Sequence, residues 1–231
     1  MSGAPSVPPG WSGWETLPLG AAVDSAVLAE ILDGGQAFRW RLEQGVWSGQ
    51  FENTVVRLAL AADGVARWSA PTALAPAAGP ALAHYFDLAR HPQELADTLP
   101  WRSDPHLAVC VAEFPGLRIL RQPFGETLLC FLCSATKQIV QIKQMVALLA
   151  ERHGSVIAAD LPAIASAKAG RHGTALLSPS PATHHPSPAF RRLPTWPELA
   201  HIPEADLRAC QFGFRARFIH QTAKFLAAHP G

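Results

Sequence analysis

The segment GETLLCFLCSATKQIVQIKQMVALLAERHG, Gly125 to Gly154, carries the strongest helical pattern in the chain. Its first half is apolar on nearly every side, which predicts a buried helix. In its second half, apolar residues recur at helical spacing and form one stripe: Ile139, Ile142, Val146 and Leu149. The polar letters SATK between the halves predict an elbow that joins two helices, with Thr136 as the N-cap of the second.

The first third of the chain has the pattern of antiparallel strands. QAFRWRL, VWSGQF, TVVRLAL and GVARWSA are short runs rich in aromatic and β-branched residues, separated by EQG, Glu52-Asn53 and AADG. Such runs with short connections predict a meander sheet, which needs helices to cover one face. The sequence therefore predicts an α+β fold.

Helical patterns begin with PALAHYFDLA, in which Pro80 suits a first helical turn. HPQELADTL and DPHLAVCVAEFPG open in the same way. We expect an N-terminal sheet domain with covering helices at residues 1–105 and the first helices of a helical domain at 106–157. Further helices follow at 195–231, in TWPELAH and from Pro203 onward.

Residues 158–194 are rich in Ala, Ser, Pro and His and hold few large apolar side chains. This composition predicts an insertion or linker between the helices. His184 and His185 could bind a metal, but a solvated loop explains them more simply.

Composition and charge limit the classes of function that the chain can have. The formal net charge of +1 gives no overall attraction to nucleic acid or membrane, although a local basic face is still possible. There is no long charge-free apolar run and no secretion signal at the N-terminus, so we expect an intracellular protein with no membrane span. Cys130 and Cys133 lie in an apolar helical stretch, which favours buried free thiols over a metal or redox site.

The motifs of common enzyme classes do not occur. We find no glycine-rich phosphate loop, no HExxH and no GxSxG. Lys137, Lys143, Lys168 and Lys224 stand in no recognisable nucleophile context. From local pattern alone, the sequence shows no catalytic site, and we expect no cofactor and no metal.

Binding motifs are more informative. In FGFRARFI, Phe214 and Arg215 combine an apolar wedge with a side chain that can read a base edge. The alternative is a helix start where Phe214 and Phe218 pack inward while the arginines face solvent. The elbow is equally open: its helix-end N–H groups and Lys137 could hold a phosphate, or it could be a simple capped turn.

Several motifs in order resemble the 8-oxoguanine DNA glycosylase family. They are GGQAFRW, HYFDLARHPQELADTLPWRSDPHL, LRILRQPFGETLLCFLCS, QIVQIKQMV and FGFRARFI, and together they cover most of residues 30–157 and 193–228. The resemblance implies a sheet domain like that of the TATA-binding protein, followed by helical domains. It also implies base-excision repair of double-stranded DNA containing oxidised guanine, by a monomer in the bacterial cytoplasm or, in a eukaryote, the nucleus.

Family members flip the damaged guanine out of the duplex, cut its glycosidic bond and nick the abasic site through a lysine Schiff base. The resemblance makes Gly35 the source of the backbone carbonyl that accepts N7–H of 8-oxoguanine, a hydrogen that guanine lacks. It makes Phe214 the wedge at the bend in the DNA and Arg215 a reader of the estranged cytosine.

Two positions depart from the family pattern. Where eukaryotic members have a run of asparagines that enters the vacated space, this chain has Thr136, Lys137 and Gln138. A second cytosine-reading arginine is replaced by Gln141, so cytosine selectivity would depend on Arg215.

The family's helix-hairpin-helix, Schiff-base lysine and later aspartate follow the position of Gly231. We therefore expect this chain to correspond to the N-terminal part of a DNA glycosylase with apurinic-site lyase activity, and to be inactive alone, with no catalytic residue. Two other functions are possible: a non-catalytic DNA-binding accessory module, and a relative of the alkylated-base glycosylases.

Overall fold

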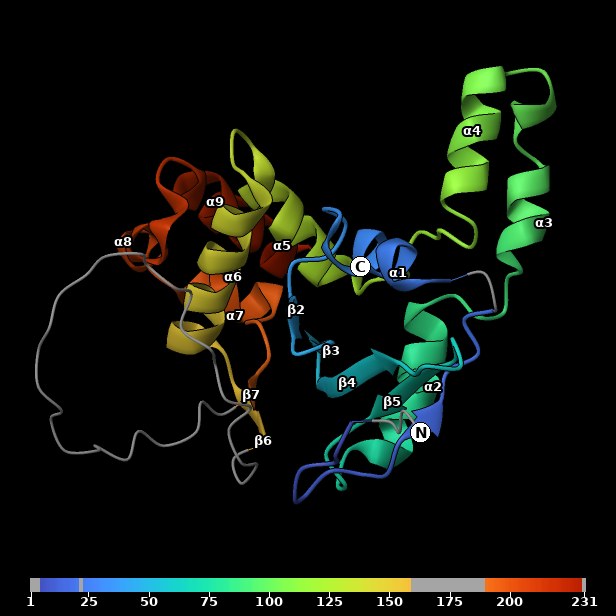
Figure 1. Cartoon of the computed structure of the whole chain (residues 1–231). Coiled ribbons are helices and arrows are strands. Elements are labelled where there is room, and N and C mark those ends of the chain that lie inside the picture. Colours follow the sequence, from blue (N-terminus) through green and yellow to red (C-terminus); the bar gives the residue numbers. More distant parts are fainter. Residues whose placement is uncertain (1–4, 21–22, 159–189, 230–231) are drawn as a thin grey trace, which may run out of the picture.

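A computed structural model describes residues 5–20, 23–158 and 190–229. It confirms the α+β fold: an antiparallel sheet with helices on one face is followed by a helical unit (Figure 1). His184 and His185 lie outside the described residues, as does most of the predicted insertion.

The sheet has five strands in the order β1-β5-β4-β3-β2. The four predicted strands are β2 (Trp40–Glu43), β3 (Val46–Phe51), β4 (Thr54–Leu60) and β5 (Ala66–Ser69), and all pair antiparallel. The short β1 (Glu15–Thr16), which the pattern did not indicate, adds an edge beside β5. The meander order follows from the short connections, which only allow neighbouring strands to pair.

The alternation along β3 positions one face in the core. Trp47 and Phe51 belong to the first hydrophobic cluster, together with Leu58 and Trp68 of the neighbouring strands. The register places Trp40 opposite Gly49, where an added Cβ would lie 2.4 Å from the Trp40 ring. Glycine thus leaves room for a fully buried tryptophan.

Helices α1 (Ser25–Asp33) and α2 (Ala75–Tyr85) cover this face of the sheet. Asp24 caps α1, with its carboxylate accepting from the backbone N–H groups of Ala26 and Val27. Contrary to the sequence prediction, α2 begins before Pro80, which lies inside the helix. The helix starts at Ala75 and has a different proline in its first turn, so that proline provides the favoured first-turn geometry.

Helices α3 (Pro92–Asp97) and α4 (Pro105–Glu113), with the 3₁₀ turn η1 (Pro100–Arg102) between them, project from the sheet domain (Figure 1). Both begin on a proline, as predicted, and neither has a buried residue. Because the first core cluster extends to Leu120, we propose that the boundary between the two units lies after α4, near Pro123.

The helical unit contains α5 (Phe124–Ser134), α6 (Ile139–His153), α7 (Trp196–His201), α8 (Glu204–Leu207), the π-helical turn η2 (Arg208–Phe212) and α9 (Arg215–Ala228). The predicted elbow is present between α5 and α6. The prediction that the first half of this segment is buried is wrong, because Phe131 is 72% exposed. Only one side of α5 faces the second cluster, through Leu129, Cys130 and Cys133.

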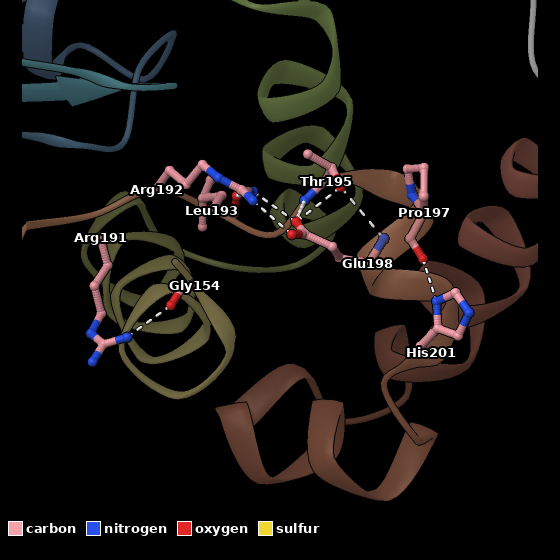
Figure 2. A network of polar contacts seen from close by, with 8 residues as sticks. All are labelled: Gly154, Arg191, Arg192, Leu193, Thr195, Pro197, Glu198 and His201. Carbon is pink, nitrogen blue, oxygen red and sulfur yellow. Dashed lines mark hydrogen bonds and ion pairs between the residues drawn. The ribbon is translucent and has the colours of Figure 1, made fainter. Parts of the chain in front are cut away.

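The two ends of the predicted insertion are joined. Strands β6 (Val156–Ala158) and β7 (Phe190–Arg191) pair antiparallel, so regular structure resumes at Phe190, earlier than the sequence indicated. Figure 2 shows how β7 is held: the guanidinium of its last residue, Arg191, donates to the Gly154 carbonyl (2.8 Å). The base of the insertion is therefore attached to the end of α6.

A capping box starts α7. The Thr195 hydroxyl and backbone N–H both donate to the Glu198 carboxylate, and that carboxylate also accepts two bonds from the Arg192 guanidinium, at 2.6 and 2.7 Å (Figure 2). These bonds lower the pKa of Glu198 from 4.5 to about 2, with the Arg192 hydrogen bonds as the largest cause.

In the described part of the chain, no helix is long and apolar enough to cross a lipid bilayer.

We predict that Glu198→Gln removes a pH-dependent part of the stability. A carboxylate whose pKa is lowered on folding stabilises the fold above its unfolded pKa, and this contribution is lost as the pH falls from about 4.5 to about 2. Glu198 is partly exposed, so the difference at pH 7 should not exceed about 1 kcal/mol. Urea unfolding at several pH values should show the wild type and Glu198→Gln converging in acid. Thr195→Ala, which leaves the Arg192 bonds to the carboxylate in place, should show a smaller convergence, because the Thr195 hydroxyl contributes only one of the bonds that lower this pKa.

Candidate nucleic-acid interface

Gly35 lies in the connection between α1 and β2, where the chain turns toward the helical unit. Its φ of +110° is a conformation that side chains disfavour, and an added Cβ would also contact Ile139 Cδ1 at 3.4 Å. The glycine lines an open cavity of about 480 Å³, together with residues of α5 and of the segment that precedes it. The first residue of α6 and the predicted recognition glycine are thus direct neighbours.

Glutamine side chains fix the backbone next to Gly35. The Gln36 amide donates to the Arg118 carbonyl (3.1 Å) and accepts from the Leu120 N–H (2.9 Å). The Gln36 carbonyl in turn accepts from the side chain of Gln122. A loop held on both sides in this way keeps its carbonyl groups in fixed directions.

The elbow is a tight turn. Ala135 has φ −51° and ψ 118°, Thr136 has φ +55°, and the Lys137 N–H donates to the Ser134 carbonyl at 3.0 Å. These values describe a type II turn, whose third residue is favourably glycine or asparagine. A β-branched threonine there is strained.

The prediction that Thr136 caps α6 is wrong, because Gln138 is the N-cap. The Gln138 N–H donates to the side chain of Gln141 (3.3 Å). A threonine with positive φ cannot take the extended conformation that an N-cap normally has. Gln141 therefore closes the first turn of α6 in this structure.

Arg215 is buried, with 4% of its surface exposed, and its guanidinium points at the elbow. It donates to the Ala135 carbonyl and to the Thr136 hydroxyl (2.8 Å). A third bond, to the Phe212 carbonyl, is long at 3.4 Å. These bonds hold the strained turn, so in this conformation the guanidinium is not presented to a base.

Phe214 and Phe218 lie on the surface, with 55% and 53% exposed. Their rings meet edge to face at 6.3 Å, and the Arg215 guanidinium lies 4.3 Å from the Phe214 ring centre. The alternative in which the phenylalanines pack inward and the arginines face solvent is therefore wrong for Phe214, Phe218 and Arg215. Of these four residues, only Arg217 is exposed as that alternative predicted. The exposure of these residues is reversed because the first turn of α9 lies beside the elbow. Arg215, on the buried side of that turn, donates to the polar groups of Ala135 and Thr136.

The structure thus connects the predicted site residues in one series. Gly35 lies beside Ile139, close enough that an added Cβ would touch it, and Ile139 begins the helix after the elbow. The elbow is bonded to Arg215, next to Phe214. Thr136, Gln138 and Gln141 are exposed, and Lys137 is half-buried.

The sequence analysis missed Phe124 and Phe131, exposed aromatic residues that line the cavity beside Gly35. A helix apolar on all sides was the available signal, because its excess apolar side must face a pocket or a partner.

A buried ion pair connects the units behind the cavity. The Arg39 guanidinium lies 3.7 Å from the Glu126 carboxylate, which also accepts from the Glu52 N–H at 2.9 Å. Burial raises the pKa of Glu126 and lowers that of Arg39. Burial likewise raises the pKa of the Cys130 thiol to about 12 and that of Cys133 further. Both thiols are free and protonated near neutral pH, which makes them poor nucleophiles and metal ligands.

Residues 19–128 match the family model described as the 8-oxoguanine DNA glycosylase N-terminal domain. These residues, just under half of the chain, are similar to the N-terminal domain of the 8-oxoguanine DNA glycosylases. Two curated relatives agree. The N-glycosylase/DNA lyase OGG1 of Arabidopsis thaliana is 27% identical over 130 residues, which are 56% of this chain and 28% of the relative. The N-glycosylase/DNA lyase of Saccharomyces cerevisiae is 30% identical over 146 residues, 63% of this chain and 32% of the relative.

Solved 8-oxoguanine glycosylases have the same fold. The 8-oxoguanine glycosylase/lyase of Clostridium acetobutylicum, in complex with double-stranded DNA containing cytosine opposite 8-oxoguanine, superposes with a TM-score of 0.64 at 26% identity. The match covers 87% of this chain and 59% of that one. A structure of MBOgg1 with a low-affinity DNA ligand gives 0.65 at 26% identity, covering 86% of this chain and 58% of that one. The matches to the two curated relatives cover 28% and 32% of their lengths, so the chain spans only part of those proteins.

A less similar DNA glycosylase shares the fold. The 3-methyladenine DNA glycosylase of Archaeoglobus fulgidus superposes with a TM-score of 0.59 at 16% identity, over 92% of this chain and 66% of that one. At this identity the likeness shows a common architecture and carries no information on the damaged base.

We predict that Arg215→Ala lowers the free energy of unfolding by about 2–4 kcal/mol, because it leaves a buried carbonyl and a strained turn without their donor. Arg217→Ala, in the same helical turn but exposed, should change it by less than about 0.5 kcal/mol. Denaturant unfolding of both variants measures the difference. Equal effects would show that the guanidinium bonds at the elbow do not stabilise the fold.

Proposed function

We propose that this chain is the lesion-recognising part of a base-excision repair enzyme, a DNA glycosylase with apurinic-site lyase activity that removes 8-oxoguanine from double-stranded DNA. The observation that carries the proposal is that the Gly35 loop lies beside Ile139, just after the elbow, and that the elbow is bonded to Arg215 next to the exposed Phe214. Lesion recognition and duplex distortion require groups on one continuous surface.

The proposed ligand of Gly35 follows from the chemistry of the lesion. Oxidation converts N7 of guanine from an acceptor into an N–H donor, so one fixed carbonyl can distinguish the two bases. A purine needs an open apolar cavity beside that carbonyl. The cavity lined by Gly35, Phe124 and Phe131 offers aromatic side chains for stacking.

The elbow and Phe214 would act on the duplex from which the base has been removed. Phe214 is an exposed apolar side chain of the kind that enters a disturbed base step. Gln138 and Gln141 offer amide groups to the estranged base, Lys137 offers a charge to a phosphate, and Thr136 sets the turn. We assign Arg215 to holding the elbow, so cytosine selectivity would depend on these amides. We expect a monomer that works in the bacterial cytoplasm or the nucleus.

We predict that the 231-residue chain forms no Schiff base, because none of the described residues lining the cavity is a lysine. Incubation with a duplex carrying 8-oxoguanine opposite cytosine, followed by borohydride reduction, should give no covalent adduct. A covalent adduct would contradict this prediction. Stable binding without an adduct is also what a non-catalytic DNA-binding module would show.

We predict that Gly35→Ala lowers the preference for 8-oxoguanine over guanine by up to about tenfold, the worth of one good hydrogen bond. Alanine disfavours a φ of +110° and would move the carbonyl. Fluorescence anisotropy with paired duplexes, at two salt concentrations, separates this preference from salt-dependent phosphate binding. Gly64→Ala, which has a similar φ of +76° in a turn of the sheet, is the matched control and should keep the preference.

A further inference from the structure

Lys143 joins the two units at a point that the sequence analysis did not single out. It lies on α6, one turn after Ile139, and its ammonium donates to the Trp40 carbonyl at 3.0 Å. The same ammonium forms an ion pair with the carboxylate of Asp33. Asp33 ends α1 and Trp40 begins β2, so one side chain grips both ends of the connection that contains Gly35.

The position of Asp33 shows why a lysine is needed. A carboxylate at the C-terminal end of a helix meets the negative end of the helix dipole, and the last turn of α1 contains no basic residue. Lys143 supplies the missing positive charge from the other unit. The Lys143 side chain is mostly buried, at 17% exposed, whereas the Asp33 side chain is 42% exposed, so solvent screens part of the attraction.

The grip fixes the distance between two functional features. The elbow leads directly into α6, and the first residue of this helix, Ile139, lies beside Gly35. Lys143 prevents the Gly35 connection from sliding along that helix, because its two partners stand on either side of the glycine. The Gln36 and Gln122 bonds fix the same connection to the segment before α5.

We propose that Lys143 is a positioning residue for lesion recognition, which sets the Gly35 carbonyl relative to the elbow through Asp33 and Trp40. The inference rests on the proposed function of Gly35. It predicts that discrimination between 8-oxoguanine and guanine depends on a side chain that contacts neither base nor phosphate.

The test compares Lys143→Met and Asp33→Asn with the wild type by anisotropy on paired duplexes containing 8-oxoguanine or guanine opposite cytosine. The measured ratio is the Kd of the guanine duplex divided by the Kd of the 8-oxoguanine duplex. Both variants should lower this ratio about threefold to tenfold, while the Kd of the guanine duplex changes by less than about twofold. Lys143→Arg, which keeps a positive charge and N–H donors for both partners, should retain most of the ratio. Lys224→Met, an exposed lysine of α9, is the control for lost charge and should leave the ratio unchanged.

Hydrogen exchange separates this inference from the proposed function. In Lys143→Met, amides of residues 34–40 should exchange faster while the rest of α6 keeps its protection. If the wild type does not discriminate between the duplexes, the proposed function of Gly35 fails, and exchange alone then decides whether the grip exists. A wild type that discriminates and a Lys143→Met variant that does so equally would overturn the positioning role. Unchanged exchange at residues 34–40 would overturn it as well.

Discussion

The buried guanidinium of Arg215 is the interaction on which the candidate site depends. It donates to the Ala135 carbonyl and the Thr136 hydroxyl, and so holds a threonine in a left-handed conformation that its branched side chain disfavours. The turn sets the direction in which α6 leaves, and α6 carries Ile139 to Gly35. The same arginine begins α9 and leaves Phe214 on the surface. One side chain thus links Phe214, the proposed wedge, to the loop of Gly35, the proposed recognition residue.

Several polar contacts join the two units. Arg39 and Glu126 pair behind the cavity, and Lys143 joins Asp33 and Trp40 beside it. Polar contacts depend on direction and distance, whereas apolar packing tolerates small shifts. They are therefore suited to fixing the Gly35 connection against α6. The apolar clusters, one in each unit, stabilise the units themselves.

The main difference between the structure and the family resemblance is the role of Arg215. The resemblance made Arg215 a reader of cytosine, whereas here its guanidinium is committed to the elbow. An arginine beside an exposed phenylalanine has the same sequence pattern in both cases. The two roles differ only in which neighbour supplies the acceptors, and that neighbour lies about 80 residues earlier in the chain.

The sequence by itself determined the strands, the two helices on either side of the elbow and the order of the motifs, because turns and apolar periodicity are local properties. It placed Gly35, Phe214 and the elbow residues on the candidate site through the family pattern. Tertiary structure decided the rest. Pro80 lies inside α2, Phe131 faces solvent, and Arg215 is buried, since each outcome depends on what packs against the helix. Lys143 could not be found from its own neighbours, because its partners, Asp33 and Trp40, come from a connection more than 100 residues away.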